Sequence, residues 1–414
     1  MIMGVLVVSR RDNFSDILEH WGDVCVVNGE AEPTDLQIYD LSQCFDSMWL
    51  KETINDVYDA NIKDDKIALL YESNKTSQVS IKTPVGVTER KEIEEVVMQG
   101  GVFGGILCSL QNDKVGRESI ETGENIYKYK NSVHVPSLGF VDDGIGIALC
   151  GDESVKLNVK TVEATKAKKL SLNTDKCKVL HIGKKMKCRA NLKVHDSAMK
   201  SVDHEKYLGQ YISADGKNDR NIEDRCSRGI GIISQVHVLM TAISIGAYFF
   251  HIGLIIRETN LVNGILFGSE AWYGLTKNQI ERLENTDLSF FRKLFLAHSK
   301  SAKESFLLET GKLPLSFILI NRRLMYWHHI VNSKKEGLLL KFYTIQKSCP
   351  VRNDWVTQIR NDLNKIGLDI TDTEAQDMSK TRFKAMLKKK VTSAALSYLN
   401  EAAASHSKSK DLEF

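Results

Sequence analysis

The pattern of apolar and polar positions changes along the chain. As far as residue 214, short apolar runs bounded by Gly, Pro and Asp predict strands mixed with helices, whereas from residue 218 onward the apolar spacing is that of long helices. The predicted long helices cover residues 220–239, 248–267, 278–297 and 314–331. The pattern therefore predicts an α+β region followed by an all-helical region.

One predicted hairpin carries two adjacent acids. Apolar runs over 135–138 and 145–150 flank the hexapeptide Gly-Phe-Val-Asp-Asp-Gly (139–144), which predicts two strands joined by a tight Asp-Gly turn. Asp142 and Asp143 would then lie at the hairpin tip. Adjacent carboxylates repel each other unless solvent or a cation neutralises them, and Mg²⁺ prefers such hard oxygen ligands. The alternative is an exposed Asp-Asp-Gly turn that binds nothing.

A second acidic element lies upstream of this hairpin. A β-rich run over 36–40 ends in Asp40, and a helical pattern follows over 46–60. A carboxylate at the end of a strand beside the hairpin would complete a pocket of three acids, able to hold two Mg²⁺ ions for in-line attack on a phosphate. The alternative is that Asp40 caps the helix that follows it.

The distribution of charge along the chain predicts a polyanionic partner. The 414 residues are 42% hydrophobic and 26% charged, which is ordinary for two or three globular domains. Their net charge is only +3, but residues 1–60 hold 12 acidic and 3 basic side chains, whereas residues 156–200 hold 13 basic and 3 acidic. Such asymmetry favours phosphate contacts with nucleic acid, and a solvated basic face is the alternative. The candidate phosphate-binding residues are Lys166, Lys168, Lys169, Lys184 and Lys185.

The cysteines and the apolar segments predict an intracellular protein. The eight cysteines include no Cys-x-x-Cys pair, which favours a reducing compartment and argues against a zinc knuckle. The N-terminus has no basic region or cleavage site of a signal peptide. Residues 229–256 carry no charge and could span a membrane, but their polar side chains and glycines favour two buried helices. We therefore expect a protein of the nucleus or cytoplasm that is not secreted and has no membrane segment.

Several motifs together resemble the reverse transcriptases of non-LTR (LINE-type) retrotransposons. The strand ending in Asp40 and the Phe-Val-Asp-Asp hairpin match the two acidic motifs of that family, and a Gln-Gly pair opens a glycine-rich loop between them. A Leu-Asn-x-x-Lys block and a Tyr-Leu-Gly hairpin then follow in the family's order. The family's usual Leu-Ser-Pro after Gln-Gly is absent here. Segments 264–272 and 309–314 continue the resemblance, which covers most of the chain.

The resemblance implies RNA-directed DNA synthesis. Asp40, Asp142 and Asp143 would be the catalytic acids and would bind two Mg²⁺ ions, with Mn²⁺ as an alternative. The partners would be an RNA template, a DNA primer and dNTPs, and an endonuclease activity would come from another domain or chain. A nucleic-acid-binding relic without activity is one alternative, and another palm enzyme such as a nucleotide cyclase is a second.

Further site residues follow from the resemblance alone. Phe45 would exclude a ribose 2′-hydroxyl; ordinary core packing is the alternative, and the match of spacing favours the first interpretation. Gln99 and Gly100 would lie under the nascent base pair. Lys176 would contact the triphosphate, with a simple surface lysine as the alternative. The primer grip would consist of Tyr207, Leu208 and Gly209.

The fold implied by the resemblance is a right-hand polymerase palm, with a ferredoxin-like antiparallel sheet and helices, followed by an all-helical thumb and C-terminal region. The expected divisions are a fingers remnant (1–24), the palm (25–214), a helical thumb or connection (215–335) and a basic helical extension (336–414). The family's earlier fingers motifs are not found, and Val8 stands where the family usually has Arg. We therefore expect a fragment that lacks most of the fingers.

Overall fold

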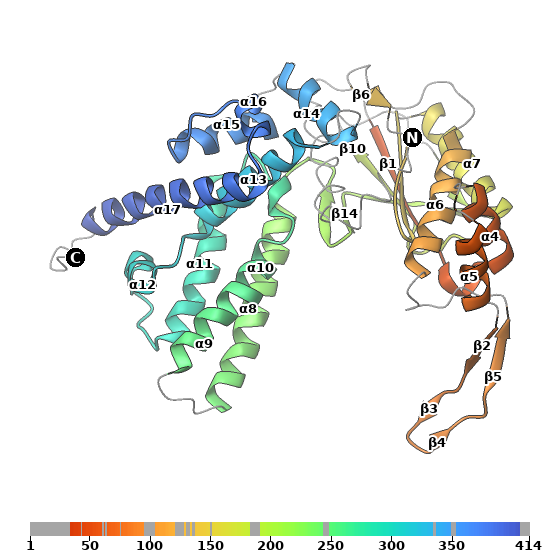
Figure 1. Ribbon diagram of the computed structural model, residues 1–414, viewed down its shortest axis with the longest axis horizontal. Coiled ribbons are helices and arrows are strands. Elements are labelled where there is room, and N and C mark those ends of the chain that lie inside the picture. Colours follow the sequence, from red (N-terminus) through yellow and green to blue (C-terminus); the bar gives the residue numbers. More distant parts are fainter. Residues whose placement is uncertain are drawn as a thin grey trace. The chain divides into compact units, whose positions relative to one another are not determined.

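The structure is a computed structural model whose secondary structure and topology are shown in Figure 1. It describes residues 34–42, 44–59, 62, 64–74, 76–94, 104–120, 128–129, 133–134, 137–149, 151–182, 191–242, 248–333, 337–348 and 353–405. By their contacts, these residues form two units. We call residues 34–208 with 212–215 the sheet unit, and residues 209–211 with 216–405 the helical unit. The expected fingers remnant, 1–24, lies outside the described residues.

The order of elements confirms the expected fold class, an α+β region with a palm-type sheet followed by a region whose described elements are helices. The helices of the sheet unit are α3 (Cys44–Ser47), α4 (Leu50–Asp59), α5 (Asp64–Asn74), α6 (Gly104–Ile120) and α7 (Asp152–Ala167). The strands of the chain are β1 (Thr34–Asp40), β2 (Thr76–Val79), β3 (Lys82–Thr83), β4 (Gly86–Val87), β5 (Lys91–Glu94), β6 (Lys128–Tyr129), β7 (Val133–His134), β8 (Ser137–Phe140), β9 (Asp143–Leu149), β10 (Lys178–Ile182), β11 (Lys193–Val194), β12 (Ser197–Ala198), β13 (Lys200–Val202), β14 (His204–Tyr207) and β15 (Gln210–Ser213).

The central sheet has five strands in the order β13-β10-β1-β9-β8. Strand β1 lies in the middle and pairs antiparallel with both β10 and β9, and β8 pairs antiparallel with β9. The expected all-antiparallel sheet is wrong in one respect, because β13 pairs with β10 in parallel. The sequence of β13, Lys-Ser-Val, is too short and too polar to predict a fifth strand of this sheet.

One face of this sheet is covered by α6 and α7, which contact each other and the hairpin β8–β9. Close approach is possible because glycines face the helices: a Cβ on Gly146 would lie 3.0 Å from Leu157 of α7, and one on Gly139 would lie 3.1 Å from Asn112 of α6. Gln37 on the same face donates through Nε2 to the carbonyl oxygen of Ser154 at 2.7 Å. By the alternation of a strand, Leu36, Ile38 and Asp40 point to the opposite face.

A buried carboxylate joins the helices of the sheet unit. Asp56 of α4, whose side chain is only 2% exposed, lies 2.9 Å from the ammonium of Lys114 on α6 and 2.8 Å from that of Lys168, which follows α7. These three segments are far apart in the sequence, so the ion pairs fix α4 against α6 and α7. Losing one partner would leave a charge in a poorly hydrated place.

The helical unit confirms the predicted long helices. The expected helix at 248–267 consists of three segments, because a π-helical turn interrupts it. The elements are α8 (Asp219–Ala242), α9 (Tyr248–Ile256), the π-helical turn η2 (Arg257–Leu261), α10 (Val262–Ile265), the 3₁₀ turn η3 (Ser269–Ala271), α11 (Lys277–Leu294), α12 (Lys303–Thr310), α13 (Leu315–Val331), α14 (Leu338–Ser348), α15 (Trp355–Lys365), α16 (Asp372–Gln376) and α17 (Lys380–Ser405). None of the helices in the described part of the chain is long and apolar enough to cross a bilayer.

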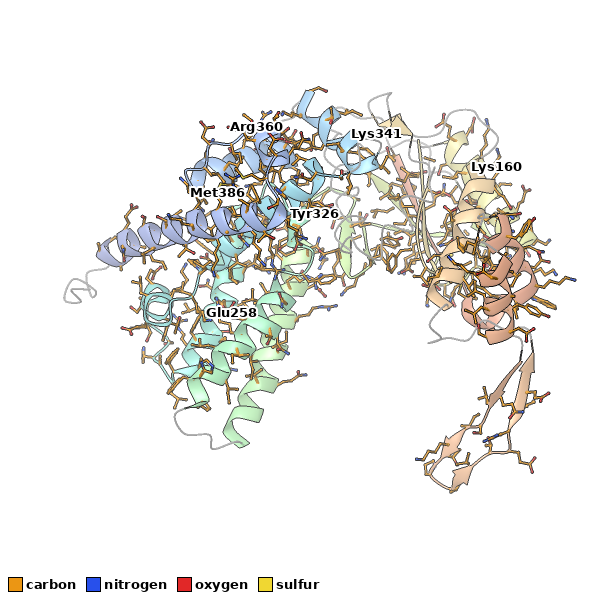
Figure 2. The ribbon with its side chains drawn as sticks, viewed as in Figure 1. Lys160, Glu258, Tyr326, Lys341, Arg360 and Met386 are labelled. Atoms are coloured by element: carbon orange, nitrogen blue, oxygen red, sulfur yellow. The ribbon has the colours of Figure 1, made fainter. Side chains whose placement is uncertain are left out.

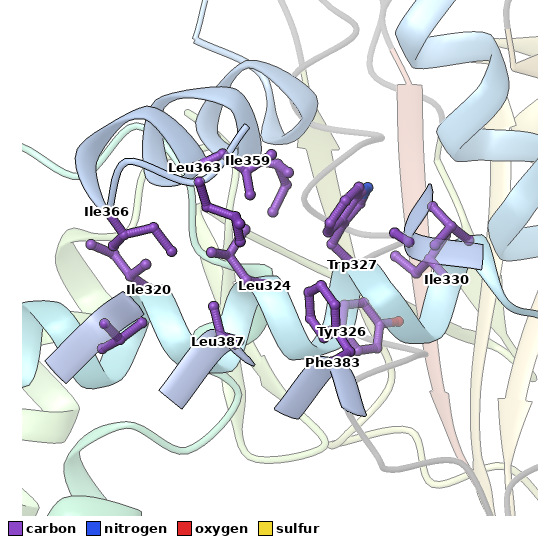
Figure 3. Packing of buried hydrophobic residues seen from close by; sticks show 14 of the residues in the cluster. Ile320, Leu324, Tyr326, Trp327, Ile330, Ile359, Leu363, Ile366, Phe383 and Leu387 are labelled. Atoms are coloured by element: carbon purple, nitrogen blue, oxygen red, sulfur yellow. The ribbon is translucent and has the colours of Figure 1, made fainter. Parts of the chain in front are cut away.

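The largest core of the helical unit forms around α13. Figure 3 shows α13 side chains such as Leu324 and Trp327 packed between residues of α15 and α17. Trp327 also donates a hydrogen bond to the hydroxyl of Tyr343 on α14 at 3.0 Å. The helices beyond residue 337 therefore share one core with α13.

Two buried Arg–Asp pairs tie helices of this unit together. Arg257, in the π-helical turn, donates to both carboxylate oxygens of Asp287 on α11 at 2.8 and 2.7 Å. Arg323 of α13 does the same with Asp362 of α15 at 2.6 and 3.0 Å, and both side chains are 4% exposed. Such bidentate pairs fix geometry, but each ion has lost its hydration and depends on its partner.

We predict that Asp362→Ala lowers the free energy of unfolding by about 3–5 kcal/mol, because it leaves the Arg323 charge buried without a counter-charge. The double variant Arg323→Met/Asp362→Leu should lose clearly less. Urea unfolding followed by circular dichroism measures both. The exposed pair Arg220–Glu223 provides the control, and Glu223→Ala should cost at most about 1 kcal/mol. Equal effects of Asp362→Ala and Glu223→Ala would contradict the prediction.

Candidate active site

The two acidic elements come together across neighbouring strands. Asp40, the last residue of β1, is the cross-strand partner of Asp143, the first residue of β9. Directly opposed residues of an antiparallel pair have Cβ atoms about 5 Å apart, so the two carboxylates lie side by side. Both point to the face opposite α6 and α7, since they alternate with Tyr39 and Gly144, which lie close together on the helix side. Asp40 therefore ends a strand and does not cap a helix.

The hairpin turn differs by two residues from the expected one. Phe140 pairs with Asp143, so the turn consists of Val141 and Asp142, while Asp143 and Gly144 already belong to β9. Only Asp142 lies at the tip. Val141 has a φ of 55°, a left-handed conformation that strains a β-branched residue. Sequence preferences place Asp-Gly at such turns, which explains the misplacement.

Asn112 of α6 holds this strained turn, a role that the sequence analysis missed. Its side-chain amide donates to the carbonyl oxygen of Val141 at 3.1 Å and to that of Asp143 at 3.4 Å. Val141 packs against the core cluster of the sheet unit. An asparagine within a helix gives no sequence signal for such a contact with residues that follow it by about thirty positions.

Lys176 lies next to the acidic pair. Its ammonium is 3.3 and 3.2 Å from the two carboxylate oxygens of Asp40, and its side chain is 64% exposed. The preceding turn is fixed to β1, because the amide of Asn173 donates to the carbonyl oxygen of Asp40 at 2.8 Å. The Asn173 side chain in turn accepts from the Lys176 amide at 3.3 Å. The structure thus places this predicted site residue beside Asp40.

One acid of the site has a perturbed pKa. Burial, and after it the nearby carboxylates of Asp142 and Asp40, raise the pKa of Asp143 to about 6, although Lys176 opposes the shift. The hydroxyl of Tyr207, from the expected primer grip, donates to the carbonyl oxygen of Asp143 at 3.4 Å. Burial raises the pKa of Tyr207 as well, so this hydroxyl stays protonated.

The acidic pair suits a divalent cation by its chemistry. Within the described ranges, no group of three or more His, Cys, Asp or Glu side chains is arranged closely enough to form a metal site on its own. Asp40 and Asp143 nevertheless offer hard oxygen ligands from opposed positions, and Asp142 is the next residue along the hairpin. A cation between them would relieve the repulsion that, after burial, raises the pKa of Asp143.

Several other predicted site residues cannot be placed. Gln99, Gly100, Lys184 and Lys185 lie outside the described residues. Phe45 lies in α3, but its side chain is not among those described.

Part of the expected basic patch after the hairpin forms ion pairs with acids of the same unit. Lys168 is 11% exposed and ion-paired with Asp56, so it is not available for phosphate in the way that the sequence suggested. Lys169 pairs with Glu52 at 3.4 Å, and its ammonium lies over the ring of Trp49. Lys166 is exposed. Sequence reasoning could not foresee these acid partners, because they lie more than a hundred residues away.

The Tyr-Leu-Gly hairpin is present as β14 and β15, joined by Leu208 and Gly209. Both joining residues have positive φ, 47° and 83°, as a two-residue hairpin turn of the I′ kind requires. Helix α8 holds the segment that follows. Asn221 accepts from the amide of Tyr211 at 2.7 Å and donates to its carbonyl oxygen at 2.8 Å. One turn further along, Arg225 donates to the carbonyl oxygen of Gly209 at 2.6 Å.

Arg225 is an unusual residue for this position. It is buried, and its guanidinium lies 4.9 Å from the centre of the Phe267 ring. Burial lowers the pKa of Arg225 to about 10, so it remains charged at neutral pH. Asn221 and Arg225, four residues apart on α8, therefore hold the backbone of residues 209–211, a contact that the sequence analysis missed.

Comparison with known proteins identifies the family of the sheet-containing part. Residues 14–212 match the family described as reverse transcriptase (RNA-dependent DNA polymerase). No curated protein matches the chain.

Three solved telomerase structures resemble the chain. Apo telomerase from Candida tropicalis, truncated from its C-terminal domain, has a TM-score of 0.34 at 15% identity over 48% of this chain and 38% of that one. C. tropicalis telomerase with a TWJ fragment of telomeric RNA has a TM-score of 0.38 at 13% identity over 84% and 56%. The corresponding complex from Candida albicans has a TM-score of 0.39 at 11% identity over 86% and 53%. The chain thus spans 38–56% of these relatives, and the superpositions are too loose to transfer a function.

We predict that Asp143→Asn stabilises the metal-free protein at high pH only. The pKa of Asp143 is about 6 in the folded protein and about 3.9 in an unfolded chain. Because the folded state holds this proton more tightly, its contribution to stability is present below pH 4 and is lost as the pH rises through 6.

The variant and the parent should therefore match at pH 4 and differ by roughly 1–2 kcal/mol at pH 8, with the variant more stable. Urea unfolding over this pH range, in the presence of EDTA, measures the difference. A gap that stays constant from pH 4 to pH 8 would argue against the raised pKa.

Proposed function

We propose, starting from the reverse transcriptase domain that residues 14–212 form, that this chain is an RNA-directed DNA polymerase of a non-LTR retrotransposon. It would add dNTPs to the 3′-hydroxyl of a primer annealed to an RNA template. The observation that carries the proposal is the cross-strand pairing of Asp40 with Asp143 beside Asp142, within the matched residues. The non-LTR assignment rests on the sequence motifs.

In this proposal, Asp40, Asp142 and Asp143 bind two Mg²⁺ ions, with Mn²⁺ as an alternative. Bound there, the ions would lower the pKa of the primer hydroxyl and neutralise charge on the phosphates. The protein's own contribution is to hold two opposed carboxylates at the end of the sheet, at a distance that the β1–β9 register fixes. Rigid placement of this kind avoids reorganisation during the reaction.

Nucleotidyl transfer forms one P–O bond and breaks another. The primer 3′-oxygen attacks the α-phosphorus, the α–β phosphoanhydride bond breaks, and pyrophosphate leaves with the electron pair of that bond. Lys176, beside Asp40 and largely exposed, is placed to pair with the triphosphate and with the negative charge that develops on the leaving group. To do so, it would exchange the Asp40 carboxylate for phosphate oxygens.

The remaining site residues complete the proposal. Tyr207, Leu208 and Gly209 would hold the primer end, and the hydrogen bond from Tyr207 to the Asp143 backbone connects this hairpin with the acids. Phe45, Gln99 and Gly100 would select the deoxynucleotide and support the nascent base pair. The proposed divisions are palm (25–214), thumb or connection (215–335) and basic extension (336–414), and target nicking would need another domain or chain.

A second candidate is an inactive relic that binds nucleic acid without polymerising. The observation that favours it is the ion pair between Lys176 and Asp40, which already neutralises one of the acids. The family match favours both candidates over a nucleotide cyclase.

We predict that the purified chain extends a DNA primer on an RNA template with Mg²⁺ and labelled dNTPs. The variant Asp142→Ala/Asp143→Ala should lose at least about a thousandfold in rate, because it removes the groups that hold the charge-neutralising ions. Asp152→Asn, which removes an exposed acid at the start of α7, should extend normally.

Binding of the template–primer is measured alongside extension. If the parent protein binds the template–primer in a salt-dependent way but does not extend the primer, the proposed polymerase activity is rejected and the inactive relic remains. Extension that survives in the double variant would reject the assigned acids.

We also predict that Asn221→Ala weakens the use of the primer and leaves the use of dNTP intact. The substitution removes the two hydrogen bonds between the Asn221 side chain and the backbone of Tyr211, which costs about 1–3 kcal/mol locally and loosens residues 209–211. The KM for primer should rise about tenfold while the KM for dNTP stays within about twofold. Asn400→Ala, at an exposed position of α17, is the matched control. An equal fall in kcat for all substrates would indicate general damage instead.

A further inference from the structure

The last described helix, α17, has two faces of opposite character. Every fourth residue from Phe383 is buried, and α17 contacts α13 and α12. Figure 3 shows Phe383 and Leu387 packed beside α13. Phe383 stacks on the ring of His328 at 4.3 Å between centroids, and it also contacts Trp327. The buried residues of the stripe are Phe383, Leu387, Val391, Ala395 and Leu399. The helix is therefore fixed firmly by one side.

The other face is basic in the first half of the helix. Six cations lie within residues 380–390, and all of them are exposed, around the position that Met386 marks in Figure 2. Lys390 donates to the carbonyl oxygen of Gly367 at 2.9 Å, and none of the other five pairs with an acid of the described chain. The second half, 391–405, has no Lys or Arg at all. The six cations are Lys380, Arg382, Lys384, Lys388, Lys389 and Lys390.

This arrangement works against the stability of the helix itself. Lys380, Lys384 and Lys388 follow one another at intervals of four residues, so they are neighbours on the helix surface and repel each other. They also lie at the N-terminal half of α17, where the helix dipole favours acids, and the first turn contains no acid. A local cost without a local benefit is typical of a surface that serves a ligand.

We propose that the basic face of α17 binds the phosphodiester backbone of nucleic acid, through residues other than those of the acidic pair. Ten residues of helix rise about 15 Å, which corresponds to about four base steps of 3.4 Å. The cations are exposed and pair with no acid among the described residues, so each one can replace a condensed counterion on a phosphate.

A lipid surface is the other polyanion that such a helix could meet. A helix that lies in a membrane interface needs an apolar face to insert, and the apolar residues of 380–390 are turned into the core around α13. The charge pattern thus favours a backbone of phosphates over a bilayer. The inference rests on the proposed function only for its choice of nucleic acid, since a reverse transcriptase domain works on an RNA–DNA hybrid.

The test measures binding of the full chain to a fluorescein-labelled RNA–DNA hybrid by anisotropy over a range of KCl concentrations. The variant Lys380→Glu/Lys384→Glu removes two cations. Its affinity should fall at least about tenfold at low salt, and the slope of log K against log[KCl] should fall by about 1.8, or 0.9 for each contact. Its melting temperature should be equal to that of the parent or higher, because the repulsion within α17 is relieved.

Lys277→Glu is the matched control, since it reverses an exposed lysine at the start of α11, beside Glu281. Affinity and slope in the control should match the parent. Equal slopes for parent, variant and control would overturn the proposal and make α17 an ordinary solvated surface. Loss of binding to phosphatidylserine vesicles, with binding to the hybrid unchanged, would overturn it in favour of a membrane.

Primer extension, measured separately, tells the two proposals apart. A parent protein that binds the hybrid through α17 but does not extend a primer would refute the proposed polymerase and keep this inference.

Discussion

The pairing register of β1 with β9 is the constraint on which the candidate site depends. β1 is the middle strand of the sheet, almost wholly buried and paired on both edges, so its position cannot be adjusted from either side. In a strand, a slip of one residue turns every side chain to the other face. Such a slip would move Asp143 toward α6 and α7 and separate it from Asp40. The register therefore decides whether the chain has an acidic pair at all.

The same register costs free energy at the site, and neighbouring residues partly offset this cost. Directly opposed like charges are destabilising, and the raised pKa of Asp143 expresses this repulsion together with burial. Lys176 supplies one positive charge, and Asn112 holds the backbone of a turn in which Val141 adopts a strained conformation. Strain and repulsion held in place by surrounding contacts are what a preorganised binding site requires, and a purely structural turn would have no need of them.

The sequence predicted the parts of this site that follow local rules. The strand ending in Asp40, the hairpin and the long helices follow hydrophobic periodicity and turn residues, and the structure contains them. The block around Lys176 was expected from the family resemblance, and the structure places it beside Asp40. The exact turn was misplaced, because Val141 in a left-handed conformation contradicts its local preference.

The contacts missed by the sequence analysis are non-local. The parallel strand β13, Asn112 under the hairpin, and Asn221 with Arg225 behind residues 209–211 leave no periodic trace in the sequence. They depend on which distant segments the fold brings together.

The lysines show most clearly why the local charge of a sequence segment predicts nucleic-acid binding poorly. In the basic segment 156–200, four described lysines find acid partners: Lys168 pairs with Asp56, Lys169 with Glu52, Lys176 with Asp40, and Lys178 with Glu205. In α17, by contrast, the cations pair with no acid in the part of the chain that the structure describes, although their run is shorter. A cation already neutralised by the protein must give up that partner before it can bind a phosphate, whereas an unpaired one only releases water and counterions. The segment with the larger formal charge is therefore the weaker candidate for nucleic acid, and the C-terminal helix is the stronger one.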